Sequence, residues 1–393
     1  MHWPQNRFYS PIRMIIIPLM FILAFPSRST AQLEHKLFTS NLILETKFHY
    51  GFIYAQHLEL QLFNSHFPAF EFSVEQLTYG RQSWERAYNY PILGVAFLYT
   101  PLGSNPVLGS AFALMPFINF PLYKTNTFTF GFRFALGAGY LTKKFDRITN
   151  YKDIAIGSHF NFAINLMLEA RYRLSEYFTL TAGISLQHFS NGSIKTPNYG
   201  LNVPLINLGL AYRPVRDNKD IGDRYFAPTE AFSTTLRNSI EFNFGIALGY
   251  KNMTSELGQN FLVYHLYENT FFQVSRKSKF GMGLDLSYDG SHKKILEMNG
   301  INKTSPVDIM RPGLNAAYEL MIGKLGFIVN LGFYLSGKER SNGPMYEKFS
   351  FQYVFARNFF ANVMLKVHFG RADYIGWGLG YKFDVFYGKK TIK

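Results

Sequence analysis

Apolar residues recur at every second position through long stretches of this chain, and this alternation constrains its fold more than any other feature. The clearest stretches are residues 128–140, 240–250, 280–288, 325–335 and 375–385. Successive side chains of a β-strand point to opposite faces, so a period of two over about ten residues predicts a strand with one apolar face and one polar face. The fold class is therefore all-β.

The apolar faces are predicted to contact lipid rather than a protein core. Aromatic residues make up 18% of the chain, with 41 Phe and 26 Tyr, yet the mean hydropathy is only −0.05. In a soluble sandwich the apolar faces would be buried against each other. Strands of about ten residues with aromatic ends, together with a secretory leader, favour an antiparallel transmembrane β-barrel instead.

Residues 1–31 are expected to be a secretory signal peptide. Arg7 and Arg13 precede an apolar run at 14–25, and Ser29 and Ala31 supply small residues at −3 and −1 of a cut before position 32. The alternative is a membrane anchor, but the run is shorter than the ~20 residues that a helical span needs. No helical membrane span is predicted after residue 31.

The overall charge and the cysteine count exclude several classes of function. The formal charge of +14 would fit nucleic-acid binding, but no recognition motif accompanies it, so no nucleic-acid partner is expected. The positive charge is expected either to be scattered over loops and lumen positions or to lie in basic loops that face phosphorylated outer-leaflet lipid. The chain has no Cys, which removes disulfides and thiolate metal sites.

The alternation predicts about 16 strands. An even number fits a bacterial barrel, because it returns both ends of the chain to the periplasm. Eight strands are expected within 38–214 and eight within 237–390, joined by a polar linker at 215–236. Two eight-stranded barrels in tandem and one larger barrel both fit this count. Small residues at lumen positions suit narrow, packed interiors and favour the tandem arrangement.

A histidine and a serine lie two residues apart at the end of the seventh predicted strand. His188 and Ser190 share their parity with Ala182, Ile184 and Leu186, so they are expected on the lipid-facing side. If the first strand rises from the periplasm, the loop that follows Ser190 is extracellular. A Ser/His pair at that height can meet a lipid more readily than a water-soluble substrate.

The loop after the pair supplies three more candidate site residues. Asn202 begins the next strand with lipid-facing parity, so the loop should return it beside His188, where it can hold the imidazole. Asn191 and the backbone amide of Gly192 lie close enough to Ser190 to stabilise an oxyanion. The alternative is a polar collar at the rim of a barrel, where strand ends meet lipid headgroups.

The string from 188 to 200, His-x-Ser-Asn-Gly-x-x-x-x-Pro-Asn-x-Gly, resembles the signature of the outer-membrane lipid A deacylases, the PagL-like family. The resemblance covers roughly residues 40–214. It implies an eight-stranded barrel in which Ser190 is the nucleophile, His188 the general base and Asn191 part of the oxyanion hole. The family has a glutamate where this chain has Asn202. An asparagine can orient a histidine but cannot stabilise an imidazolium by charge, so a slower enzyme or a variant substrate is expected. The longer chain looks like the acyloxyacyl-hydrolase branch of Bacteroidetes-type genomes.

Other polar residues near the motif are weaker candidates. Glu169 is expected opposite Ala182, roughly 20 Å below the motif at ~3.3 Å per residue, which is too far to replace the missing glutamate. His159 and Asn161 are expected across from the motif, where His159 is either a second-layer residue or a solvent-exposed loop histidine. His368 has lumen parity and no serine two residues later, so the second half is interpreted as a divergent copy without the chemistry.

The sequence predicts a serine esterase of the bacterial outer membrane that removes an ester-linked acyl chain from lipid A, the lipid of lipopolysaccharide, or from a related outer-leaflet lipid. No cofactor and no metal are implied, and residues 289–292 are interpreted as a polar loop. The alternative is a non-enzymatic porin, transporter or structural barrel with a decayed active site. The role of the second half and the formation of a homodimer stay open.

Overall fold

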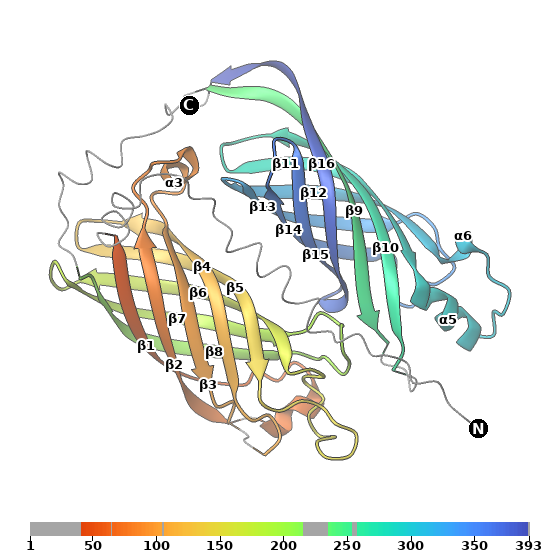
Figure 1. The fold of residues 1–393 in the computed structure, drawn as a ribbon, viewed down its shortest axis with the longest axis horizontal. Helices are drawn as coiled ribbons and strands as arrows, with labels where there is room; N and C mark the ends of the chain where they lie inside the picture. The colour runs from red at the N-terminus through yellow and green to blue at the C-terminus, as the bar shows by residue number, and fades with distance from the viewer. Residues whose placement is uncertain (1–40, 64, 104–105, 215–234, 254–257, 392–393) are drawn as a thin grey trace.

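Sixteen antiparallel strands form two closed barrels of eight strands each in the computed structural model (Figure 1). The structure describes residues 41–63, 65–103, 106–214, 235–253 and 258–391. The predicted signal peptide lies outside these residues, and so does most of the predicted linker.

The first barrel runs from Leu42 to Tyr212. Its strands are β1 (Leu42–Phe52), β2 (His66–Leu77), β3 (Ile92–Thr100), β4 (Ala111–Lys124), β5 (Phe128–Leu141), β6 (Phe160–Arg173), β7 (Phe178–Ser190) and β8 (Leu201–Tyr212). A 3₁₀-helix, η1 (Leu58–Phe63), follows β1, and a short helix, α3 (Ser83–Ala87), follows β2. The strand β1 pairs with both β2 and β8, which closes the sheet on itself.

The second barrel runs from Thr235 to Thr391. Its strands are β9 (Thr235–Asn252), β10 (Asn260–Gln273), β11 (Ser278–Asp289), β12 (Met310–Ile322), β13 (Leu325–Tyr334), β14 (Met345–Val354), β15 (Phe359–His368) and β16 (Arg371–Thr391). Two helices, α5 (Gly290–Met298) and α6 (Pro306–Ile309), connect β11 to β12. The strand β9 pairs with β10 and β16.

The strand pairing confirms the tandem arrangement, and the alternative of one larger barrel is wrong. Both give the same alternation along each strand, so the difference lies in whether β8 hydrogen-bonds to β1 or to β9. It pairs with β1 over Leu44–Gly51, which closes the first barrel before the second begins. None of the helices in the described residues is long and apolar enough to cross a membrane.

Each barrel interior is filled by inward-facing side chains. In the first barrel an apolar cluster that includes Phe67, Met115 and Phe189 occupies the part nearest the β7–β8 connection. Further along the lumen, Arg133 forms two hydrogen bonds of 2.7 and 2.8 Å with the Glu71 carboxylate. A buried guanidinium and carboxylate need such paired geometry, because unpaired charges are costly away from water.

The second barrel has a more polar interior centred on Asp285. Its carboxylate accepts hydrogen bonds from His265, Asn315 and Tyr346, and it forms an ion pair with Lys348. All of these side chains are buried. Around Asp285 the polar side chains of the lumen are thus paired with one another.

The two barrels lie side by side with like ends together (Figure 1). We call the end that carries the connections after odd-numbered strands the outer end, and the opposite end the inner end. Midway along the barrels the Phe134 and Phe351 rings stack with centroids 5.7 Å apart. At the inner end the Tyr88 hydroxyl donates to the Met321 carbonyl over 2.9 Å. At the outer end the loop after β7 contacts β9 and β16.

Candidate active site

His188 and Ser190 lie at the outer end of β7 on the surface that faces away from the lumen. Their neighbours Gln187 and Phe189 are buried inside the barrel, whereas Leu186 on the outward face is exposed. The structure therefore places the pair on the lipid side of the wall, as the alternation predicted. Both side chains are half-buried, because the neighbouring loops pack around them.

The two side chains and Asn202 form a continuous hydrogen-bonded chain. The His188 Nε2 lies 2.9 Å from Ser190 Oγ, and His188 Nδ1 lies 2.7 Å from Asn202 Oδ1. Because an amide oxygen only accepts, the ring donates from Nδ1 and keeps Nε2 free to accept the serine proton. This is the tautomer that a general base next to a hydroxyl requires.

Strand pairing holds Asn202 in place. His188 and Asn202 are direct partners across β7 and β8, and the Asn202 carbonyl accepts the Tyr54 amide at 2.8 Å from the chain just beyond β1. Asn202 is only 8% exposed, so its side chain has few alternatives to the imidazole. The loop thus returns Asn202 beside His188.

The loop between β7 and β8 is fixed by Asn191. Its side-chain amide nitrogen donates to Ser158 Oγ and to the Lys195 carbonyl, both over 2.9 Å. Its backbone amide donates to Asn198 Oδ1 over 3.0 Å. Sequence reasoning missed Ser158, which comes from the β5–β6 connection, and the role of Asn198, although the Pro-Asn pair of the motif pointed to it.

Both glycines of the motif adopt backbone conformations that favour glycine. Gly192 has φ +59° and Gly200 has φ +77°. A Cβ at Gly200 would lie 2.9 Å from Cε1 of the His188 ring, closer than atoms in contact can approach. Gly200 therefore leaves room for the imidazole. The Gly192 amide donates no hydrogen bond to the described part of the chain.

The residues across from the motif on β6 differ from those predicted. Phe162 pairs with Ser190 and Ile164 with His188, in place of Asn161 and His159. The turn after β6 leaves four residues, 174–177, outside the strands, which moves the register by one. His159 contacts the Leu141 carbonyl over 2.7 Å instead.

Glu169 is also displaced by this register and cannot serve the site. It pairs with Gly183, not with Ala182. Its side chain points into the lumen, where it contacts Lys47 at 2.9 Å and Arg171 at 2.8 Å. These ion pairs give it a structural role inside the barrel.

Two sequence candidates in the second half lie inside or at the end of that barrel. His368 is buried there and shares a 2.9 Å hydrogen bond with the Tyr334 hydroxyl. The predicted polar loop at 289–292 is instead the last residue of β11 and the first turn of α5, and the Asp289 carboxylate accepts the Ser291 amide as an N-cap. No cluster of three metal-ligating side chains occurs among the described residues.

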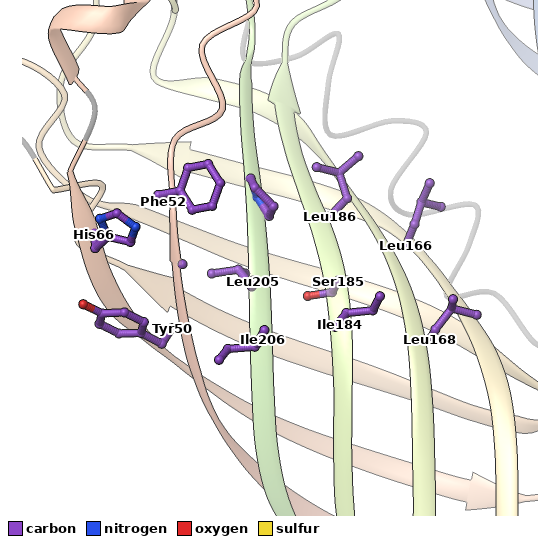
Figure 2. Close-up of a pocket in the computed structure, with 12 residues that line it drawn as sticks. Tyr50, Phe52, His66, Leu166, Leu168, Ile184, Ser185, Leu186, Leu205 and Ile206 are labelled. Atoms are coloured by element: carbon purple, nitrogen blue, oxygen red, sulfur yellow. The ribbon is translucent and has the colours of Figure 1, made fainter.

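An apolar groove of about 510 Å³ lies on the outer surface just below the Ser/His pair. The strand register explains which residues line the groove. Leu186 pairs with Pro204 directly below the His188–Asn202 pair. Ile184 pairs with Ile206 two residues earlier along β7. Tyr50 of β1 pairs with Ile206 and extends this lower pair. Figure 2 shows Leu186, Ile184, Ile206 and Tyr50 on neighbouring strands of the barrel wall.

Two family models match the chain. The one described as "Lipid A 3-O-deacylase (PagL)" matches residues 69–211, which include the whole hydrogen-bonded motif. The one described as "Acyloxyacyl hydrolase, C-terminal domain" matches residues 238–385, which span nearly all of the second barrel. The chain belongs to the lipid A deacylase family. The resemblance carried by the motif is confirmed, and membership of this family, together with the closed barrels, locates the protein in the bacterial outer membrane.

Solved structures that resemble this deacylase-family protein are distant. Neisserial surface protein A has 10% identity and a TM-score of 0.30, with 44% of this chain and 96% of that chain covered. Omp33 of Acinetobacter baumannii has 8% identity and a TM-score of 0.17, with 89% and 100% covered. These likenesses carry no argument about activity. Among curated proteins no match is found.

Proposed function

We propose that this protein is a serine esterase that hydrolyses an ester-linked acyl chain of lipid A, drawn sideways from the outer leaflet. One observation carries the proposal: a Ser–His–Asn hydrogen-bonded chain lies on the lipid-facing side of the barrel, directly above an apolar groove. Family membership supports the same substrate class.

The proposed reaction begins at Ser190. The Ser190 Oγ attacks the ester carbonyl while its proton passes to His188 Nε2, 2.9 Å away. Collapse of the tetrahedral intermediate breaks the ester C–O bond, and His188 gives the proton to the departing alcohol oxygen. A water molecule, deprotonated by His188, then releases the fatty acid from Ser190. Asn202 keeps the imidazole oriented throughout.

The negative oxygen of the intermediate needs a donor close to Ser190. The Gly192 amide suits this role because it has no other acceptor in the described part of the chain and follows the nucleophile by two residues. The side-chain donors of Asn191 are engaged with Ser158 and Lys195. Asn191 would therefore bind the oxyanion only by exchanging one of these bonds.

The motif lies between an apolar groove, which suits the acyl chains of lipid A, and a basic connection, which suits its phosphorylated headgroup. The groove below it offers Leu186, Ile184 and Ile206 to an acyl chain. The neighbouring β5–β6 connection, residues 142–159, is rich in basic residues, which would meet the phosphorylated headgroup. An ester at the boundary between chain and headgroup is then brought to the height of Ser190.

Mass spectrometry of lipid A from cells that express the wild type or Ser190→Ala tests the proposal. We expect loss of one acyl chain with the wild type and intact lipid A with Ser190→Ala. Ser73→Ala is a matched control, because Ser73 lies in the same barrel but faces the lumen, away from the groove. Intact lipid A with folded wild-type protein in the membrane, or equal loss with Ser190→Ala, would overturn it.

A further inference from the structure

The loop that follows the nucleophile is bound to the second barrel. Ser193 Oγ donates to the Ala372 carbonyl of β16 over 2.7 Å. The Ser193 carbonyl in turn accepts the backbone amide of Asn252, the last residue of β9, over 2.8 Å. The second barrel therefore holds both the side chain and the backbone of a residue three positions beyond Ser190.

Ser193 adopts a backbone conformation that is unfavourable for a residue with a side chain. Its φ is +68°, in the left-handed region that residues with a Cβ rarely adopt. Such conformations persist where surrounding contacts determine them, and they gather at functional sites. Here two of those contacts come from the other barrel.

The Asn252 side chain links the two barrels by hydrogen bonds. Its Oδ1 accepts the Thr196 amide over 3.2 Å and also accepts the Thr196 hydroxyl. Its Nδ2 donates to the Gly258 carbonyl and to Asn260 Oδ1, over 3.0 and 2.8 Å. Asn252 is itself held in place, because it is buried and pairs with Asn260 where β9 meets β10.

Gly192 is pressed against the same surface. A Cβ at Gly192 would fall within the van der Waals envelope of the Ile375 side chain on β16. The candidate oxyanion donor therefore lies between Ser190 on one side and the second barrel on the other. Movement of that barrel surface would move the Gly192 amide.

We infer that the second barrel is a positioning element of the active site, with Asn252 its principal positioning residue. Asn252 acts through Ser193 and Thr196 to fix the turn that places the Gly192 amide. This inference rests on the proposed esterase function. It gives the second barrel a role although no hydrogen bond between a serine and a histidine side chain occurs in the described part of that barrel.

Hydrolysis of a long-chain p-nitrophenyl ester by the purified full chain in detergent micelles tests the inference. Asn252→Ala and Thr196→Val should each lower kcat by roughly 10-fold, with KM within about twofold, because a small displacement of an oxyanion donor costs rate more than binding. Thr196→Ser keeps the hydroxyl and should restore most of kcat. Tyr88→Phe breaks a contact between the barrels at the inner end and should leave kcat unchanged.

A second readout separates this inference from the proposed function. Hydrogen exchange of residues 191–196 should be faster in Asn252→Ala than in the wild type and unchanged in Tyr88→Phe. If the wild type hydrolyses no ester, the proposed function fails, while faster exchange in Asn252→Ala would still support the positioning contact. Wild-type kcat in Asn252→Ala, equal losses in Tyr88→Phe, or unaltered exchange would each overturn the inference.

Discussion

Asn202 orients His188 without offering it a charge. Its Oδ1 lies 2.7 Å from His188 Nδ1 and fixes the ring in the tautomer that a general base needs. In the proposed reaction the ring becomes an imidazolium, and a carboxylate partner would add a charge–charge attraction that a neutral amide oxygen cannot supply. The amide thus supplies geometry but gives little help to the transition state.

Replacing Asn202 by glutamate should therefore speed the reaction. We expect Asn202→Glu to raise kcat by about 10-fold, which corresponds to ~1.4 kcal/mol of added transition-state stabilisation. Asn202→Gln is the matched control, because it has the same length and shape without the charge. Steady-state kinetics on both variants check this, and equal kcat for the two would show that charge at this position does not limit the rate.

The core of the site could be predicted from residues alone, and its supports could not. Period two gives the shared outward face of His188 and Ser190, and the loop length returns Asn202 to the same face. Ser158 lies in the β5–β6 connection and Asn252 at the end of β9, and both contact the motif loop through hydrogen bonds. Contacts between loops have no period, so a single sequence holds no signal for them.

At the scale of elements, one turn decides what faces the motif. The parity of His188 and Ser190 on β7 is as predicted, but a one-residue change in the turn between β6 and β7 exchanges inward and outward partners. Phe162 and Ile164 therefore pair with Ser190 and His188 in place of polar residues. The actual surroundings of the pair on β6 are apolar, which suits a lipid substrate.

The groove below the pair should set which acyl chains are accepted. Ile206 lines it and is 62% exposed, whereas Leu208, two residues further along β8, is 57% exposed and lies outside it. We expect Ile206→Trp to raise KM for long acyl esters several-fold more than for short ones. Leu208→Trp should change neither. A comparison of p-nitrophenyl esters of increasing length measures this, and a uniform change for both variants would contradict an acyl groove.

The β5–β6 connection should make the motif loop sensitive to pH. Burial raises the pKa of the Asp153 carboxyl to about 7, against a usual value of 3.8. A raised pKa in the folded state means that the packed loop favours the protonated acid. The stability that the Asp153 carboxyl contributes to the loop is then fully present below about pH 4 and is lost as the pH rises towards 7. Ala155, two residues on, accepts the Gly200 amide over 3.0 Å, so the motif loop shares this effect.

Hydrogen exchange of residues 153–158, corrected for the intrinsic effect of pH, should show less protection at pH 8 than at pH 5. Asp153→Asn should abolish that difference. Asp146→Asn is the control in the same connection, because Asp146 is exposed and its pKa is lowered by backbone hydrogen bonds. Equal pH dependence in wild type and Asp153→Asn would exclude this carboxyl as the cause.

At the scale of the whole molecule, the alternation predicts the number of strands but not how they close, and only the small lumen residues favour two barrels. Alternation marks each strand by itself, and an even count follows from barrel geometry. Whether β8 returns to β1 is decided by hydrogen bonds between residues about 160 positions apart, such as Thr46 and Leu210. The small residues at lumen positions favour narrow barrels, because the interior of a wide barrel has room for larger side chains.

The filled interiors predict that neither barrel conducts ions. In the described residues of the first barrel, an apolar cluster occupies the outer part of the lumen and the buried Arg133–Glu71 pair lies further in. In the second, the hydrogen bonds and ion pair around Asp285 occupy the centre. A porin needs a continuous water column, which these side chains interrupt. Purified protein in planar lipid bilayers should give no discrete conductance steps under conditions where a known porin does. Steps that persist in Ser190→Ala and scale with salt would favour the pore over the esterase, since they would show an open path unrelated to the outward-facing site.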